Sequence, residues 1–160
     1  MIIRVACGFD HAGVPLTDAV LSAIRSAGHE PIDIGCWDDY PDTALAVGRA
    51  VTGGDADRGI VVCGSGAGVA VAASKLPGIR ATVAHDQYTA GQCVAHDDCN
   101  VLALGARVIG PAIAAACAAA FVGTDFSGEE RHVRRLGKVQ RMESEGLEAP
   151  LDDPMDREAG

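Results

Sequence analysis

Short apolar runs alternate along this chain with longer segments in which apolar residues recur every three or four positions. The apolar runs have the length and Val/Ile content of buried strands, and they predict strands at 2–7, 31–34, 59–63, 79–84 and 101–104. The segments between them predict helices at 15–27, from about 42 to 52, at 67–75, at 86–97, over about 12 residues from Pro111, and at 128–144. Strands that alternate with helices form right-handed βαβ units. The pattern therefore predicts a single three-layer α/β/α Rossmann-like domain with a five-stranded parallel sheet.

No internal repeat or linker divides the chain, and residues 1–144 are expected to form one domain. Residues 145–160 differ in composition, because they hold six acidic side chains, one arginine and two prolines. Such a segment buries little apolar surface. We therefore predict an acidic, poorly ordered tail at 145–160.

Composition narrows the class of protein further. Hydrophobic residues make up 48% of the chain but only six are aromatic, which predicts a core of Ala, Val, Ile and Leu. The net charge of −9 argues against a nucleic-acid partner. No apolar run is long enough to cross a membrane, and the chain opens in a strand rather than a signal peptide. We expect a soluble, cytoplasmic protein whose six cysteines, none in a CxxC pair, are reduced.

The predicted topology also predicts where a ligand would bind. In open parallel sheets, ligands bind beyond the carboxyl ends of the strands. The loops that follow the first, third and fourth strands carry Asp10 and His11, residues 63–66, and His85 with Asp86. These loops are expected to cluster.

The glycine-rich run at 63–68 is the strongest local signal for chemistry. Its sequence, Cys-Gly-Ser-Gly-Ala-Gly, links a strand to a helix, where backbone amides and the helix dipole stabilise an anion. The same field favours the thiolate of Cys63, which could then act as a base. A tight connection with a buried cysteine is an equally good interpretation of this run alone. Val69 stands where a dinucleotide-binding loop needs glycine and where a cysteine phosphatase needs arginine, and no Walker Gly-Lys follows.

Other candidate residues each have a structural alternative. Asp10 could cap a helix beside a surface His11, and Tyr40 could simply pack next to a capping aspartate. His96 lies near a helix C-terminus, where it could serve only as a cap. Cys93, His96 and Cys99 have a spacing that suggests zinc, but no fourth ligand is evident.

Basic residues near the C-terminus could bind an anion. Arg131 and Arg135 are i, i+4 neighbours on one helix face and suit a phosphate, although a solvated basic face is the alternative. Arg107, after the fifth strand, could contribute to the same kind of contact.

Taken in order, these segments resemble ribose-5-phosphate isomerase B and its relatives, the galactose-6-phosphate and allose-6-phosphate isomerases. The resembling segments are FDHAG (9–13), DYPD (39–42), VCGSGAGVAVAASKLPGIRA (62–81), HDQYTA (85–90), AHDDCNVLALGARVIG (95–110) and RHVRR (131–135). Each segment alone is a weak signal, whereas the ordered set over about residues 1–144 is highly specific.

The resemblance implies an aldose–ketose isomerase that converts ribose 5-phosphate to ribulose 5-phosphate through a cis-enediolate. It implies a homodimer with an active site at the subunit interface, no metal and no organic cofactor, and it leaves open whether dimers pair into tetramers. The alternatives are an isomerase of a four- or six-carbon sugar phosphate, a non-catalytic phosphosugar-binding domain, and an enzyme that uses Cys63 as a nucleophile.

The resemblance also implies a role for each site residue. Cys63 matches the base that moves a proton between C1 and C2, and Ser65 matches the hydroxyl that assists at the sugar oxygens. His96, with Asp10 nearby, matches the group that opens the sugar ring. The remaining matches are substrate contacts: His11, Arg131 and Arg135 at the phosphate, with the two arginines from the partner subunit, and Tyr40, Gly64, Gly66, Ala67, Gly68, Asp97 and Arg107 in the pocket.

The chain departs from the family pattern at two of these positions. The family usually has His-Asn-Asp where this chain has His96-Asp97-Asp98, and Thr is common where it has Ser65. A carboxylate at Asp97 would change hydrogen bonding to a sugar hydroxyl, so this departure bears on the identity of the substrate more than on the type of reaction.

Overall fold

The computed structural model describes residues 1–155, and the last five residues of the predicted tail lie outside this range. The chain divides into two compact units, residues 1–128 and 129–160. No helix in the described part combines the length and the apolar character needed to span a membrane.

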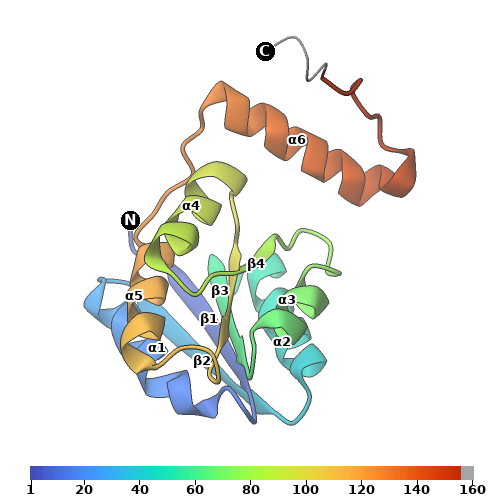
Figure 1. The fold of residues 1–160 in the computed structure, drawn as a ribbon. Helices are drawn as coiled ribbons and strands as arrows, with labels where there is room; N and C mark the ends of the chain where they lie inside the picture. The colour runs from blue at the N-terminus through green and yellow to red at the C-terminus, as the bar shows by residue number, and fades with distance from the viewer. Residues whose placement is uncertain (156–160) are drawn as a thin grey trace. The chain divides into compact units, whose positions relative to one another are not determined.

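The first unit is built on a five-stranded parallel sheet (Figure 1). The strand order across the sheet is β2-β1-β3-β5-β4, so β3 is central and β2 and β4 are the edges. The strands are β1 (Arg4–Asp10), β2 (Glu30–Trp37), β3 (Arg58–Cys63), β4 (Ala81–Val83) and β5 (Val101–Gly105). This arrangement confirms the predicted fold class.

Helices cover both faces of this sheet (Figure 1). One face is covered by α1 (Thr17–Ser26), α4 (Gln87–Asp97) and α5 (Pro111–Val122), and the other by α2 (Tyr40–Thr52) and α3 (Ala67–Ala73). Helices α1 to α4 each follow one strand and precede the next, and α5 follows β5. Helices therefore begin near the carboxyl ends of the strands, which we call the carboxyl edge of the sheet, and end near the opposite, amino edge.

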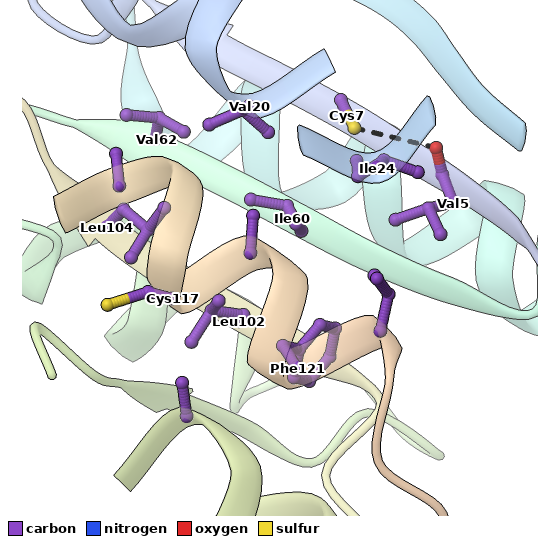
Figure 2. Close-up of a cluster of buried hydrophobic side chains, with 14 of the residues drawn as sticks. Val5, Cys7, Val20, Ile24, Ile60, Val62, Leu102, Leu104, Cys117 and Phe121 are labelled. Atoms are coloured by element: carbon purple, nitrogen blue, oxygen red, sulfur yellow. Dashed lines mark hydrogen bonds between the residues drawn. The ribbon is translucent and has the colours of Figure 1, made fainter. Parts of the chain in front are cut away.

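Alternating side chains along each strand supply the two cores. On β3, Ile60 and Val62 point into the core beneath α1 and α5 (Figure 2). Val61 and Cys63, which alternate with them, point toward α2 and α3. The second face is lined with smaller residues. A Cβ placed on Gly59 would lie 2.4 Å from Cγ1 of Val47, so this glycine lets α2 pack close to the sheet.

The predicted elements are all present, with boundaries that differ by a few residues. Helix α2 begins at Tyr40 rather than near Asp42, because Pro41 has the fixed φ that suits a first helical turn. Strand β4 is shorter than the predicted 79–84, because the Ile79 N–H donates to the carbonyl of Leu76 and keeps the start of this segment in a turn.

The second unit consists of one long helix and the residues that follow it. Helix α6 (Glu130–Glu145) carries Arg131 and Arg135 and continues into a 3-10 turn at Gly146–Glu148. Residues 149–155 have no regular secondary structure. Lys138 on α6 forms an ion pair with Asp152.

Candidate active site

The loop after β1 is organised by the carboxylate of Asp10. This side chain is buried, and its Oδ1 accepts the N–H groups of Ala12 and Gly13, each at 2.9 Å. Gly13 is required here because a Cβ would lie 2.3 Å from the carbonyl oxygen of Val62 on β3. Asp10 therefore holds its loop directly against the central strand.

His11 connects the loops after β1 and β2. Its Nδ1 lies 2.9 Å from the carbonyl oxygen of Asp38. A carbonyl can only accept a hydrogen bond, so Nδ1 carries the proton and Nε2 is the ring nitrogen left for another contact. The ring is exposed at the carboxyl edge, where a ligand can reach it.

Cys63 ends β3 with its side chain almost fully buried, 4% exposed. Its Sγ accepts a hydrogen bond from the N–H of Gly66 at 3.1 Å. Gly66 has a φ of +80°, a left-handed conformation that glycine adopts without strain, and α3 begins at the next residue. A backbone donor at the start of α3 therefore points directly at the sulfur of Cys63.

Successive residues of the turn after β5 donate hydrogen bonds to successive residues of the glycine loop. The Ala106 N–H donates to the carbonyl of Cys63, and the Arg107 N–H donates to the carbonyl of Gly64, both at 2.9 Å. Gly105 lies against Ser65 so closely that a Cβ would be 2.4 Å from the Ser65 carbonyl carbon. These contacts fix the backbone that carries Cys63 and Ser65.

Two larger side chains lie beside the glycine loop. A Cβ on Gly64 would be 3.4 Å from Nη1 of Arg107, and one on Gly68 would be 3.2 Å from the ring of Tyr40. Within residues 1–155 the guanidinium of Arg107 has no ion pair or hydrogen bond. The carboxyl edge thus brings together Asp10, His11, Tyr40, Cys63, Gly64, Ser65, Gly66, Ala67, Gly68 and Arg107.

The structure does not bring His96 to this group. His96 and Asp97 end α4, which runs back to the amino edge and leads into β5. In the sheet, Val101 of β5 pairs with Gly59, and Gly105 pairs with Cys63. The four residue steps from Val101 to Gly105 span about 13 Å. Within one chain, His96 and Asp10 therefore lie at opposite edges of the sheet, because the helix that carries His96 runs antiparallel to the strands.

At the amino edge, the ring of His96 contacts a residue of its own helix. Its Nδ1 lies 3.1 Å from Nε2 of Gln92. Asp98 has a φ of +48°, closes the helix, and forms an ion pair with Arg80 at 2.7 Å. Asp97 is exposed.

Arg131 and Arg135 belong to the second unit. Both are exposed on α6, where Arg131 contacts Oε2 of Glu129 at 2.9 Å and Nε2 of His132 at 3.2 Å. Their i, i+4 spacing places both guanidinium groups on the same side of the helix.

His85 is a residue of this edge to which the sequence pattern alone assigned no role. Its Nε2 accepts the N–H of Gly105 at 2.9 Å. Burial lowers the pKa of His85, and the charge of Asp86 offsets part of this effect. The signals in the sequence were its place in the loop after the fourth strand and its position in the HDQYTA segment.

The spacing of Cys93, His96 and Cys99 corresponds to no cluster of ligands. Among the described residues, no three His, Cys, Asp or Glu side chains are placed to hold a metal ion. Cys93 and Cys99 are buried and hydrogen-bond each other, which lowers the pKa of Cys93 and raises that of Cys99.

Comparison with known proteins gives the same result by sequence and by structure. The family model for Ribose/Galactose Isomerase matches residues 5–139. Ribose-5-phosphate isomerase B of Escherichia coli is 39% identical over 144 residues, covering 88% of this chain and 96% of that protein. D-erythrulose-4-phosphate isomerase 2 of Mycolicibacterium smegmatis is 34% identical over 146 residues, covering 87% and 96%. The solved structure of type B ribose 5-phosphate isomerase from Trypanosoma brucei has a TM-score of 0.83 at 46% identity, covering 88% of this chain and 98% of that one.

A parallel sheet of this topology, with these relatives over nearly its full length, defines a sugar-phosphate aldose–ketose isomerase. The chain belongs to the ribose/galactose isomerase family, and the resemblance drawn from its motifs is confirmed.

Proposed function

We propose that this enzyme interconverts ribose 5-phosphate and ribulose 5-phosphate, with Cys63 as the base. The observation that carries the proposal is the hydrogen bond from the Gly66 N–H to Cys63 Sγ, at the end of the central strand. The thiolate removes the proton from C2 of the open-chain aldose, and the C1 carbonyl becomes part of an enediolate. Transfer of the hydroxyl proton from O2 to O1, assisted by Ser65, together with return of the carbon-bound proton to C1, leaves the carbonyl at C2, so the atoms and electrons balance without an external oxidant.

The glycine loop would stabilise the enediolate. The Ala67 N–H donates to Oγ of Ser65 at 3.2 Å, and the Gly68 N–H, also in the first turn of α3, has no acceptor within the helix. Oriented donors of this kind stabilise charge that develops only in the transition state. Tyr40 and Arg107, on either side of the loop, would shape the sugar pocket.

The position of His96 supports a site shared between two copies of the chain. A ring-opening residue must reach the same sugar as Cys63, yet within one chain the two residues lie at opposite edges of the sheet. A two-fold pair of antiparallel sheets would bring the amino edge of one copy to the carboxyl edge of the other. In this arrangement His96 and Asp97 of one copy would complete the site that contains Cys63 of the other.

Mixed dimers test this arrangement directly. Cys63→Ala and His96→Ala are each expected to be inactive, whereas co-expression should produce hybrids in which one site carries both changes and the other neither. Random pairing would make half of the dimers hybrid and restore about a quarter of the wild-type activity. Failure of the co-expressed, verified hybrids to regain activity would contradict the shared site.

The phosphate is proposed to bind His11, Arg131 and Arg135, with the two arginines supplied by the second copy. Arg131→Ala and Arg135→Ala should each raise KM for a phosphorylated substrate about tenfold or more, as expected for loss of a charge-assisted contact. Lys138→Ala on the same helix, where the lysine is paired with Asp152, is the matched control and should leave KM unchanged.

The sugar itself is identified by a coupled assay across four-, five- and six-carbon aldose and ketose phosphates. We expect the highest kcat/KM with the five-carbon pair and no turnover by Cys63→Ala, which should still bind the substrate. The similarity to a D-erythrulose-4-phosphate isomerase makes the four-carbon pair the second candidate. Turnover of none of these sugars would overturn the proposed function.

Proton transfer by this route uses only groups supplied by the protein. Activity should therefore survive dialysis against EDTA, measured in the same coupled assay. Loss of activity that zinc restores would instead point to the cysteines at 93 and 99.

A further inference from the structure

We infer that His85 is a positioning residue of the active site, which holds Gly105 and, through Gly105, the backbone of the Cys63 loop. The inference rests on the proposed function, since it concerns the residues assigned to proton transfer there. It differs from that function in assigning a role to a side chain that does not itself contact the reacting carbons.

The hydrogen bond from Gly105 takes the place of a missing strand. Strand β4 pairs with β5 only from Ala81 to Val83, opposite Val101 to Ala103, so β5 extends past the end of its neighbour. The Ala84 N–H still reaches the Ala103 carbonyl at 3.4 Å. One step further, the Gly105 N–H would have no strand carbonyl to meet, and Nε2 of His85 accepts it at 2.9 Å.

Gly105 is the point at which this hydrogen bond can affect the chemistry. On its other side, a Cβ would lie 2.4 Å from the carbonyl carbon and 2.6 Å from the carbonyl oxygen of Ser65, so the two backbones are in direct contact. The next two residues, Ala106 and Arg107, donate to the carbonyls of Cys63 and Gly64. Residues 105–107 therefore each contact one of residues 63–65. His85 in turn accepts a hydrogen bond from the first of them, Gly105.

Acceptance by Nε2 also fixes the state of the ring. Nε2 must be unprotonated, so the neutral imidazole carries its proton on Nδ1. Burial, which lowers the pKa of His85, favours this neutral form, while Asp86 alongside opposes it. A glutamine at position 85 could present an oxygen near the place of Nε2, whereas an alanine could not.

Steady-state kinetics of His85→Ala and His85→Gln test the inference. Because small displacements of reacting groups slow catalysis steeply, we expect His85→Ala to lower kcat about 10- to 100-fold with a change in KM below about threefold. His85→Gln should recover most of this loss. His29→Ala is the matched control, because Nδ1 of His29 accepts the Ile3 N–H at 3.3 Å in the same kind of bond at the amino edge. His29→Ala should lower Tm by about as much as His85→Ala does, without changing kcat.

Amide exchange gives a readout that is independent of turnover. Exchange of the Gly105 N–H should accelerate at least tenfold in His85→Ala and stay unchanged in His29→Ala. Faster Gly105 exchange with a wild-type kcat, or equal losses of kcat in both variants, would overturn the positioning role alone. A wild-type protein inactive on every sugar phosphate would overturn the proposed function and this inference with it.

Discussion

The arginines at the two edges of the sheet differ in whether they are paired with an acidic side chain. At the amino edge, arginines at the starts of strands are each paired with an aspartate: Arg4 with Asp57, Arg58 with Asp125 and Arg80 with Asp98. At the carboxyl edge, Arg107 lies over Gly64 with no such partner in the described part of the chain. The paired arginines stabilise the fold. The guanidinium of Arg107, which has no such partner and lies near a buried thiol, is suited to bind an anionic ligand.

The side chain of Arg58, at the amino edge, makes several contacts within the protein. Its guanidinium donates to the carbonyl of Phe121 and lies 5.6 Å from the centre of the ring of the same residue. Burial lowers its pKa, an effect that Asp125 and other nearby charges oppose. Such a side chain has little capacity left for a substrate, and this contrast between the edges can be tested.

Removal of the thiol at the carboxyl edge should have the largest effect. Cys63→Ala should lower kcat on the order of 10³-fold, the range expected for loss of a general base, while substrate binding by calorimetry is retained. Cys36→Ala, which removes an exposed thiol of β2, should leave kcat unchanged. A Cys63→Ala enzyme with near-normal turnover would remove the basis for the proposed chemistry.

The backbone contact behind the thiol should be the next most sensitive feature. Gly105→Ala forces a methyl group into the Ser65 backbone and should lower the free energy of unfolding by about 2–3 kcal/mol, with loss of activity. Gly110→Ala, at a position where a Cβ meets nothing within 4 Å, should change it by less than about 1 kcal/mol. Urea unfolding of both variants measures the difference, and equal effects would show that the contact is not tight.

The arginines of the two edges should separate binding from stability. Arg107→Ala should raise KM for a sugar phosphate about tenfold and leave the free energy of unfolding nearly unchanged. Arg58→Ala should do the reverse, lowering the free energy of unfolding by about 2 kcal/mol with an unchanged KM. If both variants altered the same quantity, the distinction between the edges would not hold.

The smallest expected effect is on the pH dependence of stability. Because burial lowers the pKa of His85, the unfolded chain takes up this proton first as the pH falls below about 6.5. The free energy of unfolding should therefore decrease from that pH downward, until the folded state is also protonated. His85→Gln should reduce this slope, and urea midpoints between pH 7 and 5 would measure it. Identical slopes in both proteins would show that the ring is not held neutral.

Much of the carboxyl edge could be predicted from the sequence because its signals are local. Apolar runs located the strands, and polar residues directly after them located Asp10, His11 and residues 63–68. The position of Arg107 over Gly64 could not be predicted, since it depends on β5 lying next to β3, and strand order leaves no local trace. The role of His85 depends on β4 ending before β5 does. The strand ends that decide this differ from the predicted ones by only a few residues.

The position of His96 relative to Cys63 could not be predicted, for a different reason. Its family role was assigned from a matching motif, and motifs carry no information about which copy of a chain supplies a residue. Strand direction alone places the end of α4 at the amino edge. Combining the two kinds of information assigns His96 to the partner copy in the proposed shared site.

The hydrogen bond from His11 to Asp38 has a consequence for the proton inventory of binding. With Nδ1–H committed to a carbonyl, a neutral ring offers an incoming phosphate only the lone pair of Nε2. A favourable contact then requires a proton between Nε2 and the phosphate, which a P–OH group of the monoanion can supply, so where the dianion prevails in solution the proposed complex should hold more protons than its separated components. Calorimetric titrations with inorganic phosphate in buffers of different ionisation enthalpy would show this uptake, which makes ligand affinity a function of the hydrogen-ion concentration even before any carbon–hydrogen bond is broken.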